Sequence, residues 1–299
     1  MHRRLGGEVS VSDPEPRQAE FVSISTRGFH RIAYTEWGDP TSPRVVVCVH
    51  GLSRQGRDFD RLAVALARDG YRVLCPDLVG RGRSDRLRNP DEYALPQYCM
   101  DMTALVARSG VASVDWIGTS LGGLIGMVLA GQAASPIRRL VVNDIGPFMP
   151  WSALHRLGSN LRSAPADFAD FAAAEAYYRT VVAPFGELGD AEWRHLTEHS
   201  VERGPDGRYR MLCDPMIARA FRTGLLYNLS LWRYWDGIRC PTFVLRGEHS
   251  DLSLEGTVAE MARRNPQAEV VEIPGCGHAP SLLDADQIDI IVRWLARGR

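Results

Sequence analysis

The stretch Val114-Asp115-Trp116-Ile117-Gly118-Thr119-Ser120-Leu121-Gly122-Gly123 decides the fold of this chain. It opens with a short apolar run, typical of a buried strand, and ends in small residues. The residues that follow, 124–130, are almost all apolar and predict a buried helix. A strand, a tight turn and a helix therefore meet at Ser120. Gly118 and Gly122 flank this serine with the G-x-S-x-G spacing of a nucleophile elbow.

The two glycines have a steric reason. A serine at such an elbow sits in a strained backbone conformation, and the strand and helix pack too closely for a Cβ at either glycine position. The helix that follows directs its N-terminus at the serine. Its free N–H groups and positive dipole end favour a developing oxyanion at that point. The spacing therefore predicts a serine nucleophile at Ser120.

Four more motifs follow buried strands elsewhere in the chain. Apolar runs lead into His50-Gly51, into the loop Asp77–Asp85, into Glu248–Asp251 and into Gly277-His278. With these motifs in this order, the chain resembles the α/β-hydrolase superfamily from about residue 20 to its end. The resemblance implies an α/β fold with a mostly parallel eight-stranded sheet and helices on both faces. It also implies a helical lid inserted after the sixth strand.

The alternation of strand and helix patterns divides the chain. Residues 1–18 are polar and predict a loosely attached tail. Residues 19–145 and 236–299 form the predicted hydrolase core, which begins with an antiparallel hairpin at the sheet edge. Residues 146–235 form the predicted lid, because helix patterns but no strand pattern can be found there. The clearest predicted lid helices are 166–182, 191–202 and 215–223.

A serine hydroxyl is unreactive at neutral pH, so the nucleophile needs a base within hydrogen-bond reach. We expect His278 to be that base, because it follows a strand and a glycine-bearing turn and the family carries its histidine in such a Gly-His. The third member must orient the imidazole. Asp251 stands in the loop where the family usually places its acid. Asp144 is a rival after the preceding core strand, and Glu248 is a third choice.

An oxyanion hole needs two N–H donors aimed at one point. The resemblance implies that Leu121, next to the nucleophile, and Leu52, in the turn after His50-Gly51, supply them through their backbone N–H groups. It implies that His50 braces this loop rather than taking part in catalysis. The loop Asp77–Asp85 resembles the family's D-x-x-G-x-G-x-S signature, whose glycines shape a turn near the site.

Two residues are candidates for substrate binding. Arg54 follows the oxyanion loop, so its guanidinium could hold a substrate carboxylate in a bidentate pair. The competing reading is an ion pair with Asp58 or Asp60. Trp151 belongs to the aromatic residues of the predicted lid, some of which we expect to line an apolar cleft over Ser120.

Composition excludes several classes of function. The 299 residues carry a formal net charge of −1, which gives no sign of a nucleic-acid or membrane-surface partner. There is no lysine, so no Schiff-base lysine or Walker lysine exists. We expect no cofactor and no metal.

None of the six cysteines forms a C-x-x-C pair, which predicts reduced thiols in a cytoplasmic protein. Neither a signal-peptide pattern nor a membrane-spanning run is found.

The sequence therefore predicts a serine hydrolase that cleaves a small, apolar carboxylic ester or lactone through an acyl-enzyme. A C–C bond hydrolase of ring-cleavage products shares the triad and lid. Against it, Thr119 precedes the nucleophile where asparagine is expected in that family, and the oxyanion loop is not glycine-rich. A slow or inactive ligand receptor on the same scaffold is a further alternative. Acyl transfer, the natural substrate and the oligomeric state stay open.

Overall fold

The computed structural model describes residues 14–221 and 228–297, and its centre is one eight-stranded sheet. β1 and β2 form an antiparallel hairpin at one edge, β2 pairs antiparallel with β4, and the remaining pairs are parallel. The predicted mostly parallel sheet with an edge hairpin is confirmed. In spatial order the strands are β1 (Arg17–Ser25), β2 (Gly28–Trp37), β4 (Arg72–Pro76), β3 (Val45–Val49), β5 (Val114–Thr119), β6 (Ile137–Asn143), β11 (Thr242–Gly247) and β12 (Ala268–Ile273).

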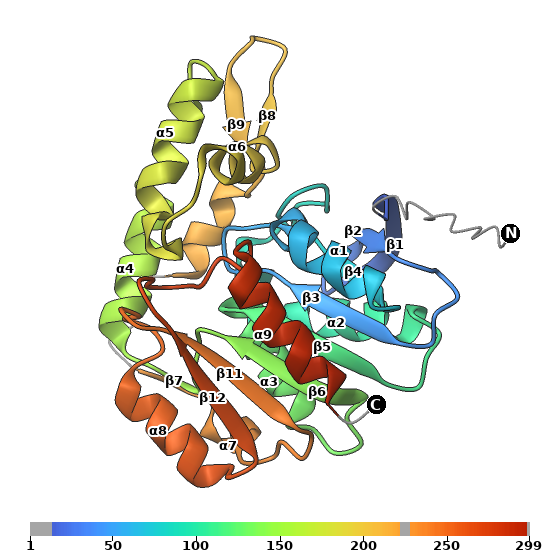
Figure 1. The fold of residues 1–299 in the computed structure, drawn as a ribbon. Coiled ribbons are helices and arrows are strands. Elements are labelled where there is room, and N and C mark those ends of the chain that lie inside the picture. The colour runs from blue at the N-terminus through green and yellow to red at the C-terminus, as the bar shows by residue number, and fades with distance from the viewer. Residues whose placement is uncertain (1–13, 222–227, 298–299) are drawn as a thin grey trace, which may run out of the picture.

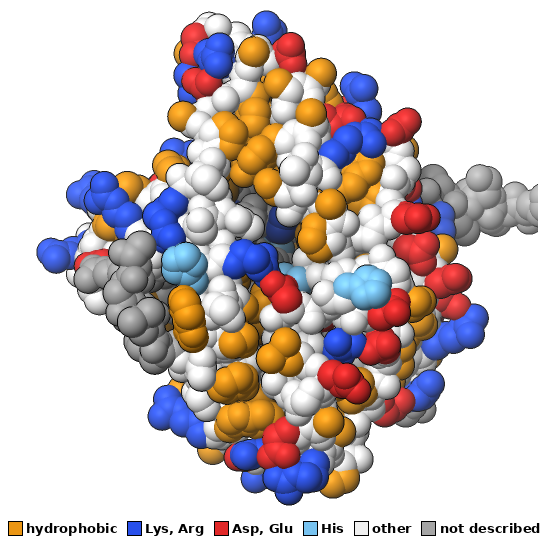
Figure 2. All heavy atoms as spheres, turned by 90° about the vertical axis from the view of Figure 1, so that its left-hand side faces the viewer, with side chains coloured by type: hydrophobic (Ala, Val, Ile, Leu, Met, Phe, Trp, Pro, Cys, Tyr) orange, Lys and Arg blue, Asp and Glu red, His pale blue; other side chains and the backbone are white. Residues whose placement is uncertain are grey.

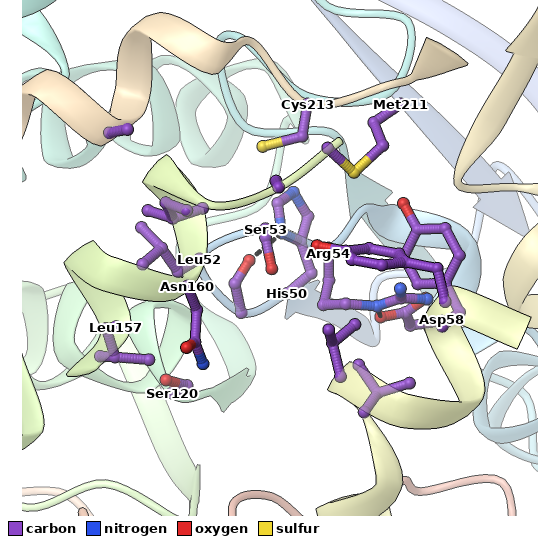
Figure 3. Close-up of a pocket in the computed structure, with 18 of the residues that line it drawn as sticks. His50, Leu52, Ser53, Arg54, Asp58, Ser120, Leu157, Asn160, Met211 and Cys213 are labelled. Carbon is purple, nitrogen blue, oxygen red and sulfur yellow. Dashed lines mark hydrogen bonds and ion pairs between the residues drawn. The ribbon is translucent and has the colours of Figure 1, made fainter. Parts of the chain in front are cut away.

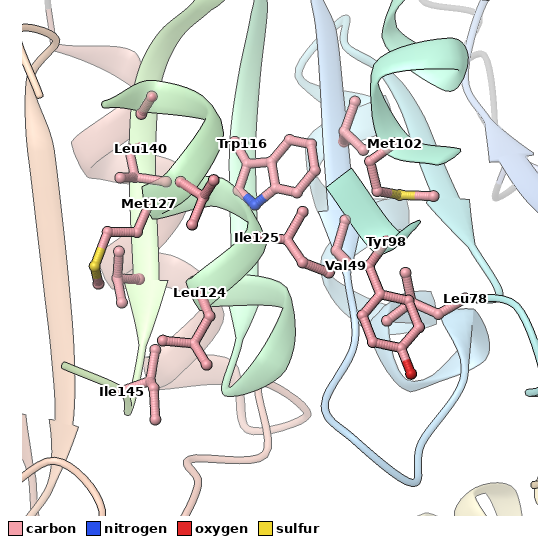
Figure 4. Packing of buried hydrophobic residues seen from close by; sticks show 14 of the residues in the cluster. Val49, Leu78, Tyr98, Met102, Trp116, Leu124, Ile125, Met127, Leu140 and Ile145 are labelled. Atoms are coloured by element: carbon pink, nitrogen blue, oxygen red, sulfur yellow. The ribbon is translucent and has the colours of Figure 1, made fainter. Parts of the chain in front are cut away.

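Helices cover both faces of this sheet (Figure 1). The central strand β3 is a continuous apolar run because both of its faces are buried. Its residues 45, 47 and 49 face one cluster with α2, α3 and α8, whereas residues 46 and 48 face another with α1 and α9. Figure 4 shows the first cluster, in which Trp116 and Ile125 pack between strand and helix. The helices are α1 (Asp60–Arg68), α2 (Leu95–Arg108), α3 (Leu121–Ala130), α8 (Glu255–Arg264) and α9 (Ala285–Ala296).

The chain leaves the sheet after β6 and returns at β11. We call the intervening segment, residues 146–235, the insertion. Its residues 151–211 lie beyond the carboxyl ends of the strands, whereas its residues 232–235 pack against α3 (Figure 1). It has an aromatic core of its own, which includes Phe168, Tyr178 and Trp193. Its elements are β7 (Phe148–Met149), α4 (Trp151–Arg162), α5 (Phe171–Val181), α6 (Asp190–Glu198), β8 (Val201–Arg203), β9 (Tyr209–Met211), the 3₁₀ helix η4 (Pro215–Ala220), β10 (Leu229–Ser230) and α7 (Trp232–Trp235).

The insertion differs from the sequence prediction in several respects. The helix expected over 166–182 spans Phe171–Val181, and the one expected over 215–223 is a 3₁₀ helix over Pro215–Ala220, with residues 222 and 223 outside the described residues. α4 was not predicted, and the helix expected over 191–202 ends at Glu198. The next residues form the antiparallel hairpin of β8 and β9. Its turn is Gly204-Pro205-Asp206-Gly207, in which Gly207 has a φ of 81°. Proline, aspartate and a glycine with positive φ are typical turn residues, so this local signal overrides the helix pattern before it.

Candidate active site

Ser120 stands at the junction of β5 and α3 in the strained geometry of an elbow. Its φ is 50° and its ψ is −113°, a conformation that a non-glycine residue rarely adopts. A Cβ on Gly118 would lie 2.2 Å from the carbonyl oxygen of Gly122, and one on Gly122 would lie 1.9 Å from that of Val49. Both glycines are therefore required by close backbone contacts, as the spacing predicts.

Replacing Gly122 with alanine is expected to destabilise the protein by about 2 kcal/mol or more, because the new methyl group would have to displace backbone rather than a flexible side chain. Urea unfolding followed by circular dichroism measures the free energy of unfolding. Gly256→Ala is the matched control. Gly256 is exposed in the first turn of α8 with no neighbouring atom within 4 Å of a new Cβ. This control should gain up to about 1 kcal/mol, and equal losses at both sites would contradict the steric argument.

Three side chains form a continuous chain of hydrogen bonds at the carboxyl edge of the sheet. Nε2 of His278 lies 2.8 Å from Oγ of Ser120, and Nδ1 of His278 lies 2.7 Å from Oδ2 of Asp144. Ser120 and Asp144 are buried, and His278 keeps slight exposure. The arrangement allows the imidazole to accept the serine proton at Nε2 while the carboxylate holds its Nδ1–H.

The prediction that Asp251 lies beside His278 is wrong, and its rival Asp144 occupies that place. The side chain of Asp251 is 52% exposed and pairs with Arg156 on α4. Asp144 is fully buried and accepts hydrogen bonds from Gly247 N (2.8 Å) and Ser250 Oγ (2.6 Å), which belong to the end of β11 and its loop. Since β6 and β11 are parallel neighbours, both loops end at the same edge, and sequence position alone could not separate them.

The expected oxyanion donors lie on two segments next to Ser120. Leu121 is the first residue of α3, where a backbone N–H has no partner within the helix. Arg81 holds the turn that carries Leu52, because its Nε donates a hydrogen bond to the carbonyl oxygen of Leu52 over 2.8 Å. Arg81 is fully buried, and its Nη1 donates to Val79 O and Tyr98 Oη. Sequence reasoning did not identify Arg81 as a support of this loop.

His50 braces the oxyanion turn, in agreement with the role expected from the resemblance. Its Nδ1 lies 2.6 Å from the carbonyl oxygen of Gly51, and its Nε2 accepts the N–H of Leu78 over 2.9 Å. Burial lowers the pKa of His50 to about 3. The ring is therefore neutral at pH 7, and its contribution to stability is lost as the pH falls from about 6.5 toward 3.

A cavity of about 650 Å³ opens in front of Ser120 and His278. Its walls come from the oxyanion loop of the core and from α4, α5 and η4 of the insertion. Figure 2 shows this side of the molecule, which is hollowed near its centre with charged side chains beside the opening. Figure 3 shows Leu157 and Asn160 of α4 facing the same space as Ser120. This volume suits a small organic ligand.

Of the two residues predicted to bind substrate, Arg54 lines the cavity and Trp151 does not. Arg54 is buried, lines the cavity and forms a bidentate ion pair with Asp58. Trp151 does not line the cavity, so this prediction is wrong. It is 45% exposed at the start of α4 and packs edge-on against His155. The reason is helical geometry, because the residues of α4 that face the cavity lie on another side of the helix.

Among the described residues, Asp60, His195 and His199 form a group whose ligand atoms lie within 4.8 Å of one another. The two histidines are half-buried, and their rings lie 4.5 Å apart. The Asp60 carboxylate is already paired with Arg57, whose Nη2 lies 2.6 Å away. We therefore derive no metal chemistry from this group.

The six cysteines are free thiols, four of them buried. Within residues 14–221 and 228–297, no helix is both long and apolar enough to cross a membrane.

Several known proteins are similar to this chain. Residues 44–285 match the family model described as alpha/beta hydrolase fold. A 3-hydroxybutyrate-oligomer hydrolase of Cupriavidus necator is 46% identical over 92% of this chain and 96% of its own length. A 2-(acetamidomethylene)succinate hydrolase of Mesorhizobium japonicum is 25% identical over 77% of this chain and 79% of its own. The crystal structure of an alpha/beta hydrolase from Novosphingobium aromaticivorans superposes with a TM-score of 0.83 at 34% identity, covering 95% of this chain and 99% of that one.

Proposed function

Because the chain belongs to the α/β-hydrolase family, we propose that it hydrolyses linear oligoesters of short hydroxyacids, such as 3-hydroxybutyrate oligomers, through an acyl-enzyme on Ser120. The observation that carries the proposal is the unbroken hydrogen-bond chain from Ser120 through His278 to Asp144 at the wall of the cavity. A solvated serine or an isolated histidine would not perform this chemistry.

The mechanism follows from the positions of these groups. Oγ of Ser120 attacks the ester carbonyl carbon while Nε2 of His278 takes the hydroxyl proton. The carbonyl oxygen becomes an oxyanion that the N–H groups of Leu52 and Leu121 stabilise. The ester C–O bond then breaks, and His278 gives its proton to the departing alkoxide oxygen. Asp144 stays ionised throughout and stabilises the imidazolium.

Deacylation repeats these steps with water in place of the alcohol. His278 accepts a proton from a water molecule, whose oxygen attacks the acyl carbon, and then returns the proton to Oγ of Ser120. The products are one carboxylic acid and one alcohol for each ester bond. This cycle moves no electrons to or from a cofactor, and we propose none.

Two observations support an oligoester as the substrate. The relative from Cupriavidus necator, named for its action on 3-hydroxybutyrate oligomers, aligns with nearly the whole chain. The cavity is large for a simple acetate ester and continues from Ser120 beneath α4 and α5. We propose that the insertion acts as the lid of this cavity, since α4, α5 and η4 contribute to its walls. The cytoplasmic location stays a prediction.

The proposal is tested by incubating the purified protein with linear 3-hydroxybutyrate dimer and trimer and measuring release of the monomer by chromatography. We expect multiple turnovers, with kcat/KM above that for p-nitrophenyl acetate, because the larger substrate uses more of the cavity. A lactone and a vinylogous diketone, the substrate type of a C–C hydrolase, serve as competing substrates. Faster cleavage of either would contradict the oligoester proposal, and binding of all five compounds without turnover would indicate a receptor.

A further inference from the structure

Arg54 is a buried cation in the wall of the catalytic cavity. Only 5% of the residue is exposed. Its Nε and Nη2 donate to the two carboxylate oxygens of Asp58 over 2.8 and 2.7 Å. Its third nitrogen, Nη1, is buried and has no hydrogen-bond partner among the described residues. Figure 3 shows the guanidinium and carboxylate side by side at the cavity. A buried N–H group without a partner costs free energy unless a ligand satisfies it.

The side chain of Arg54 starts close to the nucleophile. A Cβ placed on Gly51 would lie 3.6 Å from Cβ of Ser120 and 3.9 Å from Cγ of Arg54. The two side chains therefore flank the same glycine. From this position the guanidinium extends along the cavity wall toward Asp58 (Figure 3). A substrate attached at Ser120 would need only a short chain to bring an acidic end group to Arg54.

The other charged side chains of the cavity also favour an anion. Its lining contains two carboxylates, and neither is free: Arg54 holds Asp58, and Asp214 accepts the hydroxyl of Tyr93 over 2.5 Å. Against these two stand six guanidinium groups, three of which are paired with carboxylates: Arg54 with Asp58, Arg156 with Asp251 and Arg210 with Asp206. The lining arginines are Arg54, Arg86, Arg156, Arg162, Arg210 and Arg219. Because an excess of one charge in a low-dielectric cleft concentrates ligands of the opposite sign, the cavity attracts acids over neutral esters.

We infer that the guanidinium of Arg54, which lines the cavity, binds a free carboxylate of the substrate once its buried Nη1 is uncovered, so that the enzyme selects acid-terminated oligoesters over neutral esters. The inference rests on the proposed function and specifies its substrate class. The rings of Tyr178 and Phe185 lie 5.4 and 5.9 Å from the guanidinium carbon and shield it from water. A charged hydrogen bond is stronger in such surroundings. Burial favours the neutral form of Arg54, but Asp58 outweighs it and raises the pKa, so the group stays charged.

Two variants at Arg54 and Asp58 should change the affinity for an acidic ligand in opposite directions. In Asp58→Asn, the amide oxygen can still accept one hydrogen bond from Arg54, whereas the amide nitrogen cannot accept the second. Because Arg54 then no longer shares its charge with a carboxylate, an acidic ligand should bind more tightly. Arg54→Gln alone would leave a buried, unpaired carboxylate, which is strongly destabilising. The double variant Arg54→Gln/Asp58→Asn removes both charges together. It should bind an acidic ligand more weakly.

The experiment measures equilibrium binding by calorimetry, with each replacement placed in a Ser120→Ala background so that no turnover is required. The two ligands are the linear hydroxyacid dimer and the same dimer with its carboxyl end converted to a primary amide. We expect Ser120→Ala to prefer the acid by about tenfold, which corresponds to the roughly 1.4 kcal/mol of one charged hydrogen bond. Asp58→Asn should widen this preference several-fold, and the double variant should abolish it, with amide binding nearly constant.

Arg61→Gln is the matched control for the loss of a positive charge. Arg61 is 48% exposed, pairs with Glu192 and does not line the cavity. It should leave the preference unchanged. The inference is overturned if acid and amide bind equally in the Asp58→Asn protein, or if the preference survives in the double variant. Either result is independent of the turnover experiment, which tests the ester hydrolase itself.

Discussion

Replacement of Ser120 with alanine is expected to lower kcat for the hydroxyacid dimer by about 10³-fold or more with the fold intact. The alanine protein keeps the cavity and the oxyanion donors but cannot form an acyl-enzyme, so only residual stabilisation of water attack remains. Monomer release measured by chromatography gives the rate. Thermal unfolding should show no loss of stability. Alanine and serine both carry a Cβ, so the strained backbone at residue 120 costs about the same free energy in either protein.

A covalent probe separates this mechanism from direct water attack. A serine-reactive phosphonate should label the wild-type protein once, at Ser120, and should not label the alanine variant. Mass spectrometry of the digested protein locates the label. Turnover near the wild-type rate in the variant, or labelling of another residue, would show that Ser120 is not the nucleophile.

Replacement of Asp144 with asparagine is expected to lower kcat by about 10³- to 10⁴-fold, as loss of the orienting carboxylate does in other triads. An amide at this position can donate to Nδ1 of His278. It then favours the tautomer with its proton on Nε2, which cannot accept the proton of Ser120. The asparagine is isosteric, and its amide oxygen can still accept from Gly247 N, so we expect kcat to fall with the fold intact.

Asp251→Asn is the matched control in the neighbouring loop. It breaks the exposed ion pair with Arg156, and such pairs contribute roughly 0–1 kcal/mol. The expected kcat is within a few-fold of the wild-type value. If the two asparagine variants gave the reverse result, the acid of the reaction would be Asp251, and the hydrogen bond between His278 and Asp144 would not describe the reacting enzyme.

Local patterns were sufficient for the sheet and for the elbow that carries Ser120. Apolar runs predict the core strands because a parallel strand buries both faces, and alternation predicts the edge hairpin because one of its faces meets water. The sequence predicts the elbow because close packing admits only glycine at positions 118 and 122. These signals lie within a few residues of the feature they specify. The hairpin of β8 and β9 has an equally local turn signal at residues 204–207, which the helix pattern before it concealed.

The partners of His278 and Arg54 depend on segments that the sequence cannot place to within an ångström. Asp144 and Asp251 both follow parallel strands that end at one edge, and only the tertiary structure decides which carboxylate meets the imidazole. The direction of Trp151 likewise depends on how α4 is rotated over the cavity. Local patterns in the sequence determined the core strands and the elbow at Ser120, because short-range sterics and burial encode them, whereas the eight-stranded fold and the place of His278 were predicted from the resemblance to a known family. Packing between distant segments decided the acid and the cavity wall, because side-chain contacts there depend on ångström-scale positions that no local pattern contains.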